Sequence, residues 1–350
     1  MTPAKTDPDA PAPAAVPTAS EQAKAALDGL QKLFASAPER VAAYRDAYVL
    51  GTDLLRALDA RIRELDPGGE VNAAQLASVC ILLGPYRNLT TLTSAVLSLH
   101  PQCLVLNHAA IRTLPNAKLN FLANYSRDKF QEFVRYACYA SHGGTGGQYG
   151  GDIHLSHGFE REAMRAAEAK LQSRGRGSVK CIVWKDSHLV TNFLREARVD
   201  VAALLRRNDR VKFMLPVRNP VDCAISNLQT GHVAFFDPAR GLSSGSRVED
   251  VVAGVLDEIA WFLGLRDTSG RPENFFLYFE HEAGRDVLER MLDFLGLPRD
   301  ETYLAAAADA FKVSGNARAT QPIEGYAGEV NRKFERYPAI RDALLKFGQR

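Results

Sequence analysis

The sequence carries almost no net charge and has no long apolar run. Its 350 residues include 43 lysines and arginines against 41 aspartates and glutamates, a formal charge of +2. Such a balance creates no global field that would draw the protein onto nucleic acid or an anionic membrane, so any anion binding must come from local basic residues. No apolar run reaches the roughly 18 residues that span a bilayer, and residues 1–20 do not resemble a secretory signal. We therefore expect a cytoplasmic protein with neither nucleic acid nor a membrane as partner.

Cysteine is scarce, and no two cysteines form a CxxC pair. Most lie in or beside stretches that favour strand or buried helix, which indicates reduced core thiols rather than disulfides or metal ligands. His142, His154 and His157 flank a glycine-rich stretch without a nearby ligand set, so no metal is expected there either. The five cysteines are Cys80, Cys103, Cys138, Cys181 and Cys223.

Composition and periodicity divide the chain into three parts. Residues 1–20 are built from Ala, Pro, Thr and Asp and bury too little surface to fold, which predicts a disordered tail. Residues 21–66 repeat apolar side chains at three-, four- and seven-residue spacings, typical of amphipathic helix, and this N-terminal helical segment ends at a Pro-Gly-Gly stop. Residues 76–350 form the third part, an α/β domain.

Short apolar runs separated by helical periodicity define this domain. They lie at 78–83, 179–184, 211–217 and 275–279, and a further short strand precedes His108. Continuously apolar strands alternating with helices favour a central parallel sheet covered by helices on both faces.

The first candidate binding motif follows the run at 78–83. Gly84-Pro85 breaks this strand, and an apolar helix starts at about Thr90. A helix that begins there directs unpaired backbone N–H groups and the positive end of its dipole at the loop, which makes an anion site. Arg87 adds a full charge, and Thr90 and Thr91 add hydroxyl donors. The loop is similar to a phosphate-binding P-loop in which threonine replaces the usual lysine and the cation lies three residues earlier.

The second motif follows the run at 211–217. Arg218-Asn219-Pro220 ends the strand, and Ser226 lies eight residues after Arg218 in the next helix. Asn219 is a good N-cap and Pro220 suits the first helical position, but neither structural role explains Arg218. The planar fork of arginine suits bidentate binding of a phosphate.

Together the two motifs resemble those of sulfotransferases that use 3′-phosphoadenosine 5′-phosphosulfate (PAPS). Residues 87–91 resemble the [KR]-S-G-T-T loop of that family, with Asn88 and Leu89 in place of serine and glycine, and residues 217–226 resemble its strand ending in R-[DN]-P followed by serine. The resemblance covers about residues 76–300, including Trp184-Lys185-Asp186 and the late Phe279-Glu280 segment. It implies a P-loop NTPase-like three-layer sandwich with a central parallel sheet.

The resemblance also implies a function, which is in-line transfer of a sulfuryl group from PAPS, as co-substrate, to a hydroxyl or amine, without a metal. The donor would be bound by Arg87, Asn88, Leu89, Thr90, Thr91, Leu92, Arg218, Ser226 and a basic C-terminal loop that includes Arg318, with Arg332 and Lys333 as further candidates. Arg87 and Lys185 would stabilise charge on the leaving phosphate.

A histidine is the expected general base, and two candidates remain open. His108 occupies the place where one branch of the family, similar to the tyrosylprotein and many bacterial enzymes, has a glutamate. His188 lies in Lys185-Asp186-Ser187-His188, which resembles the K-T-H-L-P segment of the cytosolic aryl and steroid enzymes with one residue inserted.

The acceptor, a small molecule or a glycan or peptide, cannot be identified from the motifs, and a homo-oligomeric state is left open. Acceptor specificity is expected in the N-terminal helices and in the stretches 143–151 and 235–247. Two alternatives remain: a P-loop kinase that uses ATP and Mg²⁺, and a nucleotide-binding relative without turnover.

Overall fold

The computed structural model describes residues 73–141, 151–172, 178–236, 240–313 and 323–349. The chain divides after Pro67, and all of the described residues belong to the second unit, Gly68–Arg350. The tail and the helical segment predicted for residues 1–66 lie outside the described residues, as does most of the glycine-rich stretch 143–151.

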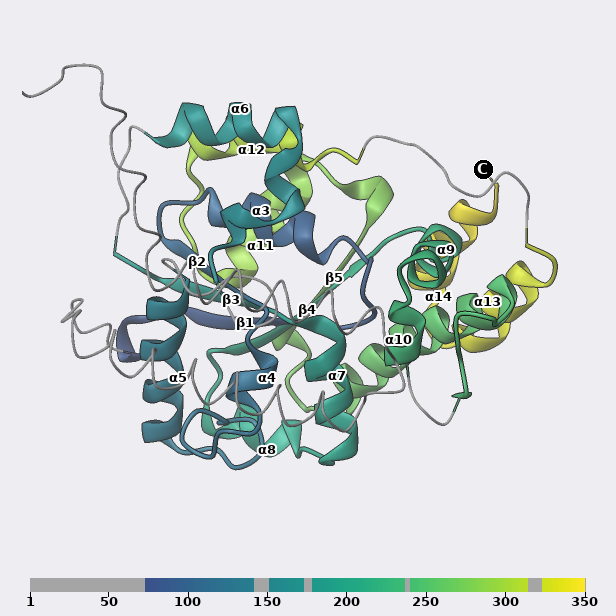
Figure 1. Cartoon of the computed structure of the whole chain (residues 1–350), viewed down its shortest axis with the longest axis horizontal. Coiled ribbons are helices and arrows are strands. Elements are labelled where there is room, and N and C mark those ends of the chain that lie inside the picture. Colours follow the sequence, from purple (N-terminus) through teal and green to yellow (C-terminus); the bar gives the residue numbers. More distant parts are fainter. Residues whose placement is uncertain (1–72, 142–150, 173–177, 237–239, 314–322, 350) are drawn as a thin grey trace, which may run out of the picture. The chain divides into compact units, whose positions relative to one another are not determined.

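Five parallel strands form one sheet in the order β2-β3-β1-β4-β5 (Figure 1). The apolar runs found in the sequence supply all of them, and β4 and β5 have the predicted bounds. The strands are β1 (Ser78–Leu82), β2 (Cys103–Asn107), β3 (Cys181–Lys185), β4 (Val211–Val217) and β5 (Phe275–Phe279).

Alternate residues of each strand pack into two separate clusters, because successive side chains point to opposite faces of a sheet. In β1, Val79 and Ile81 belong to one cluster, whereas Cys80 and Leu82 belong to the other. Both faces of the sheet are therefore buried, which explains why the strands are continuously apolar.

Helices cover both faces. The face that Cys80 and Leu82 occupy is covered by α3 (Thr90–Ser98), α6 (Glu162–Leu171), α11 (Arg285–Leu295) and α12 (Glu301–Phe311), drawn above the sheet in Figure 1. The opposite face is covered by α4 (Ala110–Thr113), α5 (Arg127–Ala140), α7 (Ser187–Glu196) and α8 (Val201–Arg207).

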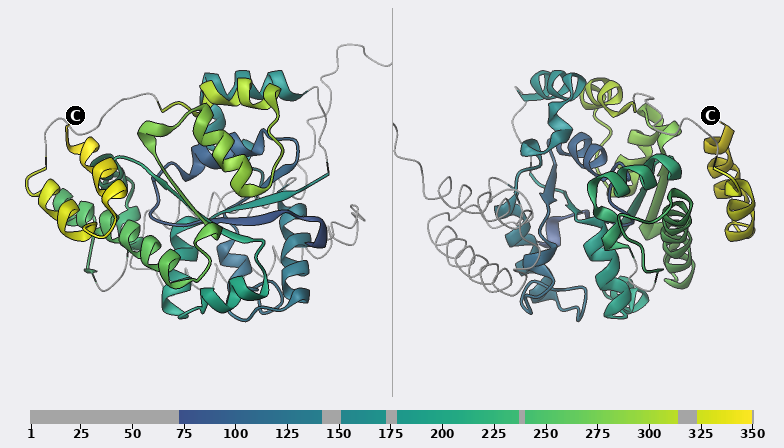
Figure 2. Two further views of the ribbon diagram at one scale, coloured as in Figure 1. Left: turned by 180° about the vertical axis from the view of Figure 1, so that it is seen from behind. Right: turned by 45° about the vertical axis from the view of Figure 1, so that its right-hand side comes forward.

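Four further helices group together at one side of the molecule in both views of Figure 2: α9 (Pro220–Thr230), α10 (Val248–Thr268), α13 (Tyr326–Lys333) and α14 (Pro338–Leu345). Short 3₁₀ turns complete the described chain, namely η2 (Ala73–Gln75), η4 (Ile153–Leu155), η5 (His157–Glu160), η7 (His232–Phe235), η9 (Pro272–Asn274), η10 (Glu280–Glu282) and η11 (Lys346–Gln349).

The predicted α/β class, with a parallel sheet between two helical layers, is confirmed. The five cysteines are buried and free, as their positions in apolar stretches predicted. Among the described helices, none combines the length and apolar character needed to cross a bilayer.

Candidate functional site

A cavity of about 480 Å³ lies at the carboxyl ends of the strands. In a parallel sheet these ends meet at one edge, where the loops to the following helices leave a crevice. Residues from the loops after β1, β2, β3 and β4 all reach it. Its lining consists of Tyr86, Arg87, Leu89, Thr90, Thr91, Leu92, His108, Ile111, His157, Lys185, Asp186, Leu189, Arg218, His232 and Phe235.

The loop after β1 is shaped by a glycine that no other residue could replace without strain. Gly84 has φ +94°, and a Cβ there would overlap Leu215 Cδ1 in β4. Only glycine adopts this conformation freely and allows such close approach. From this turn the chain runs to α3, which starts at Thr90 as predicted, and Thr90, Thr91 and Leu92 of its first turn line the cavity.

Leu89 is the N-cap of α3 and has the left-handed conformation, with φ +61° and no side-chain capping bond. The [KR]-S-G-T-T loop that residues 87–91 resemble has glycine at this position, and this sequence has leucine. A left-handed backbone costs a residue with a Cβ about 1–2 kcal/mol. The loop therefore keeps a glycine-like shape at the expense of local strain.

Asn88 ties this loop to the second motif. Its side chain is fully buried, its Nδ2 donates to Pro216 O, and its Oδ1 accepts from the backbone N–H of Arg218 at 2.7 Å. These bonds join positions about 130 residues apart in the sequence. Asn88 was predicted as a donor-binding residue, and the structure places it as a brace between β4 and the loop.

Arg87 makes a second connection between the motifs, because its Nε donates to Ser226 Oγ at 2.9 Å. Ser226 is buried in α9 and does not line the cavity, so in this structure it orients Arg87. Asn219 caps α9 by accepting from Val221 N–H at 3.0 Å, with Pro220 in the first turn, as predicted.

Arg218 lines the same cavity. Its Nε is buried, and it has no hydrogen-bond partner within the described part of the chain. Buried polar groups are nearly always paired, and a guanidinium nitrogen is suited to donate to an anionic group in this cavity.

Charged groups from β2 and β3 meet beside the loop. Lys185 Nζ donates to His108 Nε2 at 2.9 Å, and the other ring nitrogen, Nδ1, lies 3.9 Å from Asp186 Oδ1. Asp186 is buried and also accepts from the backbone N–H of Ala110. Burial lowers the pKa of Lys185 to about 8, since the attraction of Asp186 only partly offsets it, and the charge of Arg87 lowers this pKa further.

His188, the other candidate base, lies in the core rather than in the cavity lining. Its side chain has no exposure, its Nδ1 lies 3.3 Å from Gly84 O, and burial lowers its pKa to about 4. The reason is helix phase: α7 begins at Ser187, and the next position turns toward the Tyr86 and Phe236 rings. The structure therefore separates the two histidines that the sequence could not rank clearly.

Two further histidines line the cavity; the sequence singled out His157 only as one of three histidines that flank the glycine-rich stretch, and it did not single out His232. His157 belongs to η5 and His232 to η7. Burial lowers the pKa of both, and the nearby charges of Arg87 and Lys185 lower it further. The sequence signal for His232 is its position directly after the helix stop at Gly231.

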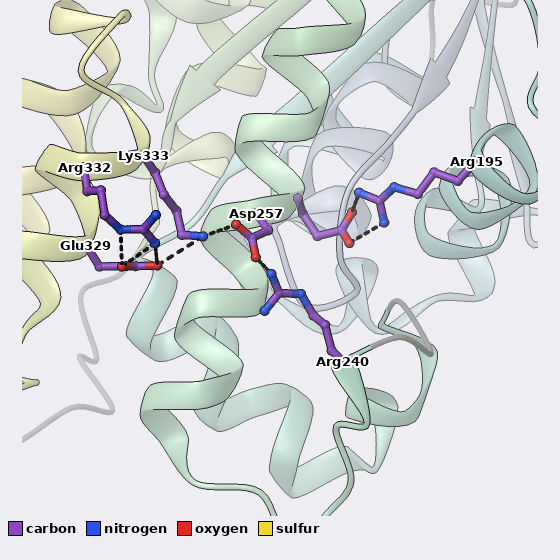
Figure 3. Close-up of polar contacts among 7 residues, drawn as sticks. Arg195, Arg240, Asp257, Glu329, Arg332 and Lys333 are labelled. Atoms are coloured by element: carbon purple, nitrogen blue, oxygen red, sulfur yellow. Dashed lines mark hydrogen bonds and ion pairs between the residues drawn. The ribbon is translucent and has the colours of Figure 1, made fainter.

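The basic C-terminal residues have other partners. Arg318 lies outside the described residues. Arg332 pairs with Glu329. Lys333 and Arg240 both form ion pairs with Asp257 of α10 (Figure 3). Arg332 and Lys333 do not line the cavity: Arg332 pairs within α13, and Lys333 connects α13 with α10.

No group of three or more histidine, cysteine, aspartate or glutamate side chains among the described residues has an arrangement suited to a metal ion.

Comparisons with known proteins give matches only among solved structures. No family model matches the chain, and no curated protein matches it significantly. A mouse sulfotransferase, SULT7A1, complexed with PAP is 11% identical with a TM-score of 0.38, over 78% of this chain and 89% of that one. Sulfotransferase STF9 from Mycobacterium avium is 16% identical with a TM-score of 0.41, over 81% and 80%.

A sulfotransferase domain from the Synechococcus PCC 7002 olefin synthase is also 16% identical, with a TM-score of 0.33, over 75% of this chain and 94% of that one.

Proposed function

We propose that the protein is a sulfotransferase that moves a sulfuryl group from PAPS to a hydroxyl or amine of an acceptor. The observation that carries this proposal is the buried, unpartnered Nε of Arg218 in the same cavity as Arg87 and the first turn of α3. Two anion sites in one cavity suit a ligand with two separated anionic groups. PAPS carries such groups on its 3′ and 5′ positions.

In this proposal the 5′-phosphosulfate lies against Arg87, Thr90 and Thr91, where the N–H groups of the first turn of α3 add to the positive field. The 3′-phosphate pairs with Arg218. Arg87 and Lys185 stabilise the charge that develops on the 5′-phosphate as the sulfuryl group leaves, so these side chains take the part that a metal ion plays in many phosphoryl transfers.

His108 is the proposed base. The acceptor oxygen attacks sulfur, the bond from sulfur to the 5′-phosphate oxygen breaks, and His108 Nε2 takes the acceptor proton. In the structure this nitrogen accepts from Lys185, so Lys185 must turn to the donor oxygens before His108 can act. An anionic donor supplies the attraction for that movement.

Calorimetry separates this proposal from a kinase. Adenosine 3′,5′-bisphosphate (PAP) should bind more tightly than ATP with Mg²⁺ and more tightly than adenosine 5′-phosphate. A preference for ATP with Mg²⁺ would overturn the assignment.

Turnover decides whether the protein is active. Transfer from labelled PAPS to a mixed acceptor panel should be detected and should disappear in Arg87→Ala. Tight PAP binding without any transfer would favour the alternative of an inactive nucleotide-binding relative.

A further inference from the structure

His108 has a strained backbone conformation directly after β2. Its φ is +52°, in the left-handed region that residues with a Cβ rarely adopt. The backbone N–H of His108 donates to Lys185 O at 3.0 Å, one position beyond the register pair of Asn107 and Lys185. Strain of this kind persists where the surrounding structure fixes it, and it gathers at functional sites. Here it presents to the cavity a ring that is 32% exposed.

The contacts of the His108 ring indicate which nitrogen carries the proton. Lys185 is mostly an ammonium at neutral pH, because its pKa is about 8, and an ammonium only donates. His108 Nε2, 2.9 Å from Lys185 Nζ, is therefore the acceptor. A neutral imidazole has one acceptor and one N–H, so the proton of the ring lies on Nδ1. A base that acts through Nε2 requires this tautomer.

Lys185 cannot hold this tautomer throughout the proposed reaction, because it turns to the donor oxygens before Nε2 accepts a proton. Asp186 Oδ1 then remains beside the ring, 3.9 Å from Nδ1. The charges of two further lining residues interact with His108, those of His157 in η5 and His232 in η7, and both are bases. Asp186 is the single carboxylate among the described residues that line the cavity. It therefore supplies the negative charge at Nδ1.

Asp186 is fixed in place by groups on both sides of His108. Its Oδ2 accepts from the backbone N–H of Ala110, two residues after His108, and its Oδ1 accepts from the Tyr86 hydroxyl at 3.5 Å. Burial and the charge of Asp186 both raise the pKa of Tyr86, so this hydroxyl stays protonated and remains a donor. The carboxylate is 1% exposed. Since one oxygen is bound to the chain that follows His108, the other is kept beside the ring.

We propose that Asp186 is a positioning residue for His108: its Oδ1 accepts from Nδ1–H, which keeps Nε2 free to take the acceptor proton. This inference rests on the proposed function. The present distance exceeds that of a hydrogen bond, and contacts of this kind shorten when the substrates bind. In the step, Nε2 takes the acceptor proton, Nδ1 keeps its own, and Asp186 stays ionised and stabilises the imidazolium.

Nitrogen NMR of the histidine rings tests the assignment without turnover, because a protonated and an unprotonated ring nitrogen differ in chemical shift. The His108 signals are those missing in His108→Gln. Lys185→Met, which cannot donate to Nε2, should keep Nδ1–H as the main form at a pH where the ring is neutral. Adding Asp186→Asn should lower the ratio of Nδ1–H to Nε2–H about tenfold or more. The asparagine oxygen would stay on Ala110 N–H, and its NH₂ group would face Nδ1 and favour the opposite tautomer.

The wild-type protein saturated with PAP provides the same test without a substitution. Lys185 is then bound to the nucleotide, and Nδ1 should still carry the proton. A majority of Nε2–H in this complex would overturn the proposal, even if the double variant did not fold.

Turnover should respond to Asp186→Asn where donor binding does not. We expect kcat to fall about 100-fold, the scale of general-base catalysis. PAP should bind equally well or up to about threefold more tightly, since a negative charge near the donor is removed. Weaker PAP binding in proportion to the loss of kcat would mean that Asp186 maintains the donor site rather than the base.

Asp300→Asn is the matched control for the structural part of the substitution. Asp300 caps α12 by accepting from Tyr303 N–H at 2.9 Å, is half-buried, and lies outside the cavity lining. Asparagine caps a helix about as well as aspartate, so both variants should fold. Asp300→Asn should leave kcat within about twofold and the His108 tautomer ratio unchanged.

The two readouts separate this inference from the proposed function. If the tautomer ratio depends on Asp186 but the wild-type protein neither binds PAP nor transfers a sulfuryl group, the sulfotransferase proposal fails while the Asp186–His108 contact is supported. If PAP binds and transfer occurs, yet Asp186→Asn leaves the tautomer ratio or kcat unchanged, the positioning role is wrong and the sulfotransferase proposal stands.

Discussion

The two halves of the cavity are held together by different forces. The donor half is the part around Arg87 and Arg218, to which the proposed function assigns PAPS. There Asn88 and Asn219 fix the loop after β1 and the end of β4 through neutral hydrogen bonds to the backbone. Asn219 N–H also donates to the Glu280 carboxylate at 2.8 Å.

The base half is the part around His108, the proposed base. There contacts between ionisable side chains position Lys185, His108 and Asp186. The donor half should therefore keep its shape at and above neutral pH, whereas the base half should change as Lys185 titrates.

The two halves also differ in their proposed roles. Under the proposed function, the neutral hydrogen bonds position cations for an anionic donor, and the ionisable contacts suit a site that accepts a proton and stabilises the leaving group. Substitution of Arg218 in the first half should thus change donor affinity, and substitution of His108 in the second half should change turnover, whereas Lys185 should affect both because it also faces the donor.

The largest expected effect is on turnover in the base half. His108→Ala should reduce kcat by about 100-fold or more, because general-base catalysis typically contributes that much. PAP affinity, measured by calorimetry, should change little. If His188→Gln lowers kcat by about 100-fold and His108→Ala does not, the base is His188, and the assignment of His108 as the base is wrong.

Arg218→Ala should weaken binding in the donor half. Loss of a charge-assisted pair is expected to weaken PAP by about 2 kcal/mol, or roughly 30-fold. Binding of adenosine 5′-phosphate, which lacks the 3′-phosphate, should be nearly unchanged and provides the control. Equal losses for both nucleotides would mean that Arg218 does not contact the 3′ position.

Asn88→Ala tests the brace between the two motifs. It leaves Pro216 O and the Arg218 N–H without their buried partner, which should lower the free energy of unfolding by about 1–3 kcal/mol. Asn88→Asp keeps the acceptor for Arg218 but puts a buried carboxylate oxygen against Pro216 O, so it should be at least as destabilising in denaturant titration. A fully stable Asn88→Ala would show that the loop holds its shape without this side chain.

Lys185 should make donor binding depend on pH. Its pKa of about 8 in the free protein means that the ammonium is largely present at pH 7 and lost above pH 8, so PAP affinity should fall as pH rises through 8. We expect a decrease of about fivefold between pH 7 and 9.5 in calorimetry. Lys185→Met should bind PAP more weakly and with no such decrease; a flat wild-type profile would contradict the assignment.

The smallest effect is expected at Leu89. Leu89→Gly should raise the free energy of unfolding by about 0.5 kcal/mol, since relief of left-handed strain exceeds the entropy that glycine adds to the unfolded chain. Leu89→Ala removes the side chain but keeps the strain and is the control. A glycine variant that melts below the alanine variant would show that the leucine side chain contributes more than its conformation costs.

The donor half was largely predictable because its determinants are local. A strand, a breaking glycine and a helix start are contiguous in residues 78–98, and the Asn219-Pro220 cap follows β4 directly. The contacts of Asn88 could not be predicted, since its partners lie about 130 residues away.

The base half was predictable only as a choice between histidines. Sequence spacing places His188 one residue into α7 but does not fix the rotation of the helix that turns it into the core. The Lys185–His108 bond depends on the neighbouring positions of β2 and β3 in the sheet, where Asn107 pairs with Lys185. Strand order is a property of the whole fold, and no short motif records it.

The ion pair between Arg195 and Glu258 has a consequence for directed evolution of this protein. Arg195 lies on α7 three residues after Asn192, the anchor of Phe235, and its guanidinium binds both carboxylate oxygens of Glu258 on α10 (Figure 3). Substitutions on α10 would therefore act on the support of Phe235, a residue of the cavity lining, from outside the cavity. They could change the shape of the cavity while Arg87 and Arg218 stay as they are.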